Sequence, residues 1–139
     1  MDLLRPWTAA VVAWIVMNIL AVLAISAWSS GTQLQTFGTR IFWIAVPQLL
    51  VGAVAATAAA YLHRRPERAD PRRHALASLG GPAVMIVLQA VLNLVGDTVL
   101  SSTLIAFVAE GCGAVLGWLF VSRVARREER AADTGSGYY

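Results

Sequence analysis

A single carboxylate, that of Glu110, lies inside a long apolar run over residues 101–127. The run can cross a bilayer as a helix, because a membrane span needs about 20 apolar residues. An ionised, unpaired carboxylate in hydrocarbon costs roughly 2.5 to more than 10 kcal/mol. We therefore expect Glu110, in its ionised or its protonated form, to face other helices, a water-filled cavity or a partner chain rather than lipid.

The composition is typical of an integral membrane protein. Of the 139 residues, 58% are hydrophobic and 14% are charged, whereas a soluble domain usually carries about 25% charged residues. Short polar segments separate four apolar runs at about residues 7–28, 41–62, 75–96 and 101–122. We therefore expect an all-α fold of four transmembrane helices in an up-down bundle.

The four spans are expected to form one domain over residues 1–127, followed by a disordered cytoplasmic tail over residues 128–139. The third run contains the sequence Gly80-Gly81-Pro82, and a proline removes one backbone hydrogen bond from a helix. We expect one span that is kinked at this point. The alternative is a short interfacial helix followed by a span that begins at Pro82.

The arginines predict how the spans are oriented. All 11 residues counted as Lys or Arg are arginines, and all but Arg40 lie on the side that holds both termini and the segment 63–74. The positive-inside rule assigns this side to the cytoplasm, and we expect the plasma (inner) membrane of a bacterium. Arg40, on the outer side, has Asp97 as a candidate ion-pair partner. The arginines expected to contact anionic lipid headgroups are Arg64, Arg65, Arg72, Arg73, Arg126 and Arg127.

Each expected span carries an amide or carboxyl side chain. With about 1.5 Å of rise per residue, one such group in each span lies roughly 10–15 Å below the outer surface. These groups are the candidate ligand, proton or cation site. For the amides, interhelical hydrogen bonding is the preferred interpretation and contact with a ligand is the alternative, whereas for Glu110 a functional and a structural role are both open. The residues of this set are Asn18, Gln48, Gln89, Asn93 and Glu110. Trp14, also in mid-span, is expected to be a packing residue.

Small residues mark the faces along which the helices are expected to pack. The glycines on these faces are Gly52, Gly113 and Gly117. The Gly113-xxx-Gly117 spacing allows two helix backbones to approach closely. A contact within the chain and a contact with a partner chain both fit this spacing.

The sequence does not favour an enzyme. It contains no Ser/His/Asp set, His–Glu metal motif or phosphate-binding glycine loop, and its one cysteine, Cys112, cannot form an intrachain disulfide. His63 and His74 lie at the edge of the spans, which argues against axial haem ligation. We therefore expect no metal and no cofactor. The positions of the arginines beside the spans also argue against a nucleic-acid partner.

In length and number of spans, the chain is similar to small multidrug-resistance transporters and to fluoride channels. The first group carries its carboxylate in the first span, where this chain has Asn18. The second group has phenylalanine- and glycine-marked motifs in the third span that do not occur here. The likeness is therefore one of size and span number.

Three functions fit these observations. The first is a non-catalytic accessory or interaction subunit of a larger membrane complex, with the small-residue faces as contact surfaces. The alternative is a small oligomeric proton- or cation-linked transporter or channel that uses Glu110. A second alternative is a binder of a lipophilic ligand or cofactor in the outer-leaflet half of the bundle. The expected partners are the lipid bilayer and either further copies of the chain or other membrane-protein subunits.

Overall fold

The described part of the chain is entirely helical. The computed structural model describes residues 4–29, 36–62, 71–96 and 100–135. Its helices are α1 (Leu4–Trp28), α2 (Phe37–Leu62), α3 (Pro71–Val95) and α4 (Leu100–Gly135). All four are long and apolar enough to cross a membrane, and this part of the prediction is confirmed.

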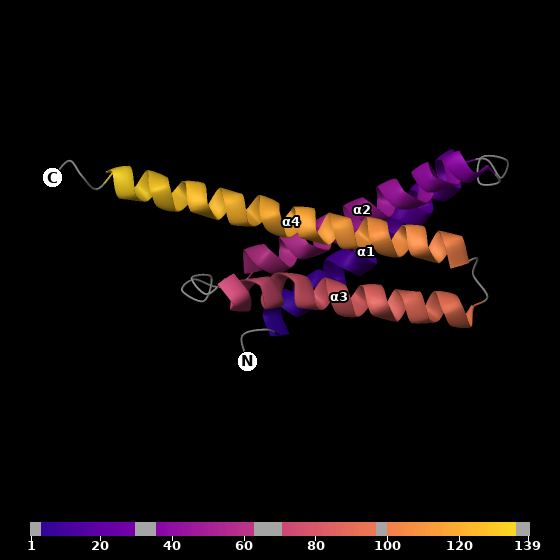
Figure 1. The fold of residues 1–139 in the computed structure, drawn as a ribbon, viewed down its shortest axis with the longest axis horizontal. Helices are drawn as coiled ribbons and strands as arrows, with labels where there is room; N and C mark the ends of the chain where they lie inside the picture. The colour runs from indigo at the N-terminus through magenta and orange to yellow at the C-terminus, as the bar shows by residue number, and fades with distance from the viewer. Residues whose placement is uncertain (1–3, 30–35, 63–70, 97–99, 136–139) are drawn as a thin grey trace.

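The helices form two antiparallel hairpins, α1–α2 and α3–α4, which cross each other (Figure 1). The C-terminal ends of α1 and α3 and the N-terminal ends of α2 and α4 lie on the right in Figure 1. The opposite ends lie on the left, so neighbouring helices along the chain run in opposite directions. Helix α2 packs against the other three helices, and α3 packs against α1 and α4 as well.

Helix α4 is longer than expected at its C-terminal end. It continues to Gly135, whereas the sequence predicted a disordered tail from residue 128. The extra turns consist mainly of Glu, Arg and Ala, which favour helix, and the helix ends at a glycine, a common stop. The helix therefore extends past the other three (Figure 1), and residues 136–139 lie outside the described part.

The most extensive contact joins α2 and α4 and depends on three glycines. A Cβ atom built on Gly52 of α2 would collide with the backbone carbonyl oxygen of Glu110. On α4, a Cβ atom on Gly113 would collide with the carbonyl oxygen of Leu49, and one on Gly117 with that of Ala53. The two backbones are thus in direct contact, and the Gly113-xxx-Gly117 spacing is used within the chain.

A second glycine pair lies where α1 crosses α3. Gly80 faces the indole ring of Trp7, and a Cβ atom on Gly81 would lie 3.0 Å from the Cβ atom of Ala10. Gly80 and Gly81 therefore give α1 room to approach, a role that the sequence analysis did not assign. Helix α3 runs through Pro82 without interruption, as the expected single span requires, and the kink stays a prediction.

The α2–α4 contact predicts different effects for two neighbouring glycines of α4. Gly113→Ala should lower the free energy of unfolding by about 1–3 kcal/mol or more, because the added methyl group must displace the α2 backbone. Gly111→Ala is the matched control, since a Cβ atom there meets nothing within 4 Å and alanine favours helix. The free energy of unfolding of both variants is measured from the loss of the helical circular dichroism signal during denaturation in detergent. Equal stability of the two variants would contradict the contact.

Candidate functional site

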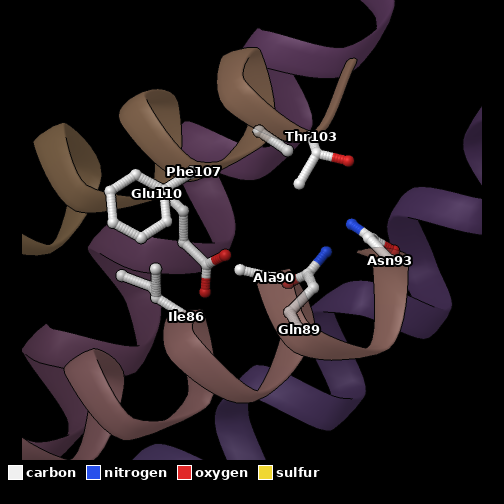
Figure 2. Close-up of a pocket in the computed structure, with 8 residues that line it drawn as sticks. Ile86, Gln89, Ala90, Asn93, Thr103, Phe107 and Glu110 are labelled. Carbon is white, nitrogen blue, oxygen red and sulfur yellow. The ribbon is translucent and has the colours of Figure 1, made fainter. Parts of the chain in front are cut away.

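Glu110 is the largest fully buried side chain in the described part of the chain, with 1% of its surface exposed. Of the environments expected for Glu110, the structure shows contact with other helices. Its backbone lies against Gly52 of α2, and its side chain points toward α3 (Figure 2). A carboxyl group at such a place is costly unless hydrogen bonds replace the lost water.

Trp14 of α1 supplies one such hydrogen bond. Its indole Nε1–H donates to Oε1 of Glu110 over 2.5 Å. Between α1 and α4 the described residues make no backbone contact, so the long indole side chain is what allows α1 to reach the carboxyl group. The sequence analysis treated Trp14 as a packing residue. Its position one helical turn before Asn18, on the same helix face, was the available signal.

A small pocket between α3 and α4 adjoins the carboxyl group (Figure 2). Its space is about that of one water molecule. The residues that line it are Ile86, Gln89, Ala90, Asn93, Thr103, Ala106, Phe107 and Glu110.

Two polar atoms of this pocket are buried without a hydrogen-bond partner, Gln89 Oε1 and Thr103 Oγ1. Thr103 is 6% exposed, and an unpaired buried polar group costs about 1–3 kcal/mol. Figure 2 shows Gln89 and Asn93 on α3 facing Thr103 and Glu110 on α4. The pocket thus offers carboxyl, amide and hydroxyl oxygens, which suit water, a hydrated proton or a hard cation.

The amides of the other two helices form a separate pair. Gln48 Nε2 donates to Asn18 Oδ1 over 3.4 Å, which joins α2 to α1. Asn18 Nδ2 donates in turn to the backbone oxygen of Trp14 over 3.0 Å. The structure therefore brings Gln89, Asn93 and Glu110 together, whereas Asn18 and Gln48 bond to each other.

The remaining candidate residues lie at the helix ends. Arg72, Arg126 and Arg127 are exposed, as a headgroup contact requires. Asp97, the candidate partner of Arg40, lies outside the described residues, as do Arg64, Arg65 and the side chain of Arg73. Within the described part, no group of three His, Cys, Asp or Glu side chains could hold a metal ion.

Comparison with known proteins does not assign a family. No protein-family model, curated protein or solved structure matches the chain. Glu110, its hydrogen bond to Trp14 and the adjoining pocket are therefore the basis for a functional proposal.

The hydrogen bond between Trp14 and Glu110 predicts an energetic coupling. Trp14→Phe should lower the free energy of unfolding by about 1–3 kcal/mol more than a change in ring size alone, because a buried carboxyl group loses its donor. Trp118→Phe is the matched control, since its buried Nε1 has no hydrogen-bond partner. With Glu110→Leu present, the excess cost of Trp14→Phe should disappear in a double-mutant cycle. The hydrogen bond would be contradicted if Trp14→Phe and Trp118→Phe lowered the free energy of unfolding equally and if Trp14→Phe showed no coupling to Glu110→Leu.

Proposed function

We propose that the chain is a small membrane protein that carries a proton or a small cation across the bilayer by binding it at Glu110. The observation behind the proposal is that Trp14 satisfies one side of a buried carboxyl group while the other side adjoins a water-sized pocket with unpartnered polar atoms. Structural polar groups are normally satisfied within the fold, whereas a binding site keeps bonding capacity for its ligand. Carboxylates within membrane spans commonly mark ion and proton pathways.

Insertion into a membrane is part of the proposal. Large apolar side chains are exposed along all four helices, a surface that soluble proteins avoid. Helices of 25 and 26 residues extend for about 38 Å at about 1.5 Å per residue, more than the hydrocarbon core of about 30 Å. Helix α3 is proposed to bend at Pro82, which lacks the N–H that a helix interior uses.

The proposed orientation has both termini in the cytoplasm of a bacterium, with the chain in the plasma membrane. The exposed arginines Arg5, Arg72, Arg126 and Arg127 lie at the helix ends that share a side with the chain termini. These are the positions that the positive-inside rule assigns to the cytoplasm. Since four helices enclose little space, the transporting unit is proposed to be an oligomer of the chain.

We rank the two other functions lower. A pocket with room for about one water is too small for a lipophilic ligand or cofactor in this conformation. The small-residue faces that suggested an accessory subunit are used for the α2–α4 contact. An accessory subunit is still the second candidate, because α4 projects beyond the other helices (Figure 1) and its C-terminal half carries the exposed Arg123, Arg126 and Arg127.

Reporter fusions test the orientation. A fluorescent protein fused after Tyr139 should fluoresce, and alkaline phosphatase at the same place should be inactive, because the C-terminus is proposed to be cytoplasmic. Phosphatase fused after Gln33, between α1 and α2, should be active. The reverse pattern would show the opposite orientation.

Flux measurements in vesicles test the role of Glu110. The purified chain in sealed liposomes should dissipate a pH gradient, followed with an entrapped pH dye, and Glu110→Gln should slow this at least about tenfold, the effect of a barrier raised by roughly 1.4 kcal/mol. Gln still offers Trp14 an acceptor oxygen, so the fold should persist. Glu110→Asp should retain part of the flux, because it keeps a carboxyl group.

The control for this experiment is Cys112→Ser, an exposed position two residues along the same helix. It should leave the flux unchanged. Repeating the assay with and without sodium or potassium separates proton movement from cation movement. Equal flux with Glu110→Gln would exclude the proposed role. No flux with the unaltered chain would favour the accessory subunit.

A further inference from the structure

The polar residues beside Glu110 all lie on one side of it along the bundle. On α3, Gln89 and Asn93 lead toward the C-terminal end of that helix, and Thr103 lies near the start of α4. Both of these ends lie on the right in Figure 1, away from the chain termini. Thr103 is roughly 10 Å from Glu110 along α4, at about 1.5 Å per residue. A line of polar groups thus leads from the carboxyl group toward the outer end.

On the other side of Glu110, the contact between α2 and α4 leaves no room for water between these two helices. Gly113, Ala114 and Gly117 follow Glu110 on α4 and are buried. A Cβ atom on either glycine would collide with the α2 backbone, and a place without room for a methyl group has no room for water. On this side, buried polar groups occur on three helices: Trp7 Nε1 on α1, Ser78 on α3, and Trp118 Nε1 and Ser122 Oγ on α4. Those on α4 lie two turns or more beyond Glu110.

We infer that Glu110 exchanges protons with the outer side of the membrane through water held by Gln89, Asn93 and Thr103. This inference rests on the proposed function and adds the direction of access. Gln89 Oε1 accepts a hydrogen bond, and the Thr103 hydroxyl both donates and accepts. Water in the pocket can thus bond to the amide oxygen, the hydroxyl group and the carboxyl group that line it, and a buried water typically makes about three hydrogen bonds.

The exchange requires no other reactant. A hydronium ion in the pocket transfers one proton to an ionised oxygen of Glu110 and becomes water, and the reverse step returns the proton to water. No other bond forms or breaks. Gln89, Asn93 and Thr103 are positioning residues, because they hold the water and do not themselves gain or lose a proton.

The groups that face Glu110 do not compete for the proton. They are Trp14 from α1, Gly52 from α2, and Ile86, Gln89 and Asn93 from α3. None of these side chains is charged or titrates. On α4 itself the Cys112 thiol is exposed and turned away from the bundle. A response of the site to pH therefore reports on Glu110.

Trp14 provides a signal for this exchange that does not depend on transport, because its indole is bonded to Glu110. A chain in which Trp14 is the one tryptophan is reconstituted into sealed vesicles, and these are sorted by whether a C-terminal tag is accessible. This requires phenylalanine in place of Trp7, Trp28, Trp43 and Trp118. A rapid pH change outside the vesicles should alter the fluorescence faster than the internal pH equilibrates where the outer face is exposed. Where the tag faces outward, the fluorescence should change only as the internal pH equilibrates.

Thr103→Val should slow the fast response about tenfold, because the water loses one of its hydrogen bonds. Thr103→Ser keeps the hydroxyl group and should keep the rate, and Gln89→Leu tests the second oxygen if the valine variant does not fold. The inference is overturned by an unchanged rate in both Thr103→Val and Gln89→Leu, by a faster response from the tagged face, or by no response from either face. A fast fluorescence response from the outer face alone, without net flux, supports the access route and overturns the proposed transport. Net flux without a difference between the two faces overturns the access route.

Discussion

The hydrogen bond from Trp14 to Glu110 joins the two hairpins through a carboxyl group that lipid cannot solvate. Its geometry depends on glycine. Because Gly52 has no side chain, the backbone at Glu110 lies directly against α2, and this places the carboxyl group at the centre, between α1 and α3. A methyl group at Gly52 would push α4 outward and move Glu110 away from the 2.5 Å contact with Trp14. The close packing of the α2 and α4 backbones and the position of the Glu110 carboxyl group therefore depend on the same glycine.

Much of this architecture follows from the sequence, because length and hydropathy determine which segments can be membrane helices. The burial of Glu110 follows from the cost of a carboxyl group in hydrocarbon. The sequence could not show which helix satisfies it, because residue counts give depth along a helix but not the rotation of that helix in the bundle. An indole is long enough to reach Glu110 from α1, which makes no backbone contact with α4 in the described part. The role of Gly80 and Gly81 beside Trp7 and Ala10 was missed for the same reason.

The amides that were expected at one level are divided between two places in the structure. Asn18 and Gln48 lie on the neighbouring helices α1 and α2, and they satisfy each other in part. Gln89 has no such partner for its Oε1 atom, because the facing side of α4 offers a threonine, small residues and the carboxyl group itself. Bonding capacity is therefore left between α3 and α4, and Gln48 Oε1 is likewise buried without a partner. The polar groups thus divide into a partly satisfied pair on one hairpin and a group that lines a pocket on α3 and α4.

The same bond also links the ionisation of Glu110 to the packing of the two hairpins. An indole N–H donates to a carboxylate in a charge-assisted hydrogen bond, which is about twice as strong as a neutral one. Protonation of Glu110 therefore weakens the connection between α1 and α4, while the glycine contact between α2 and α4 is unaffected because it contains no charge. Under the proposed function, a proton that reaches Glu110 from the pocket therefore weakens the hydrogen bond that joins the two hairpins and leaves the α2–α4 contact in place.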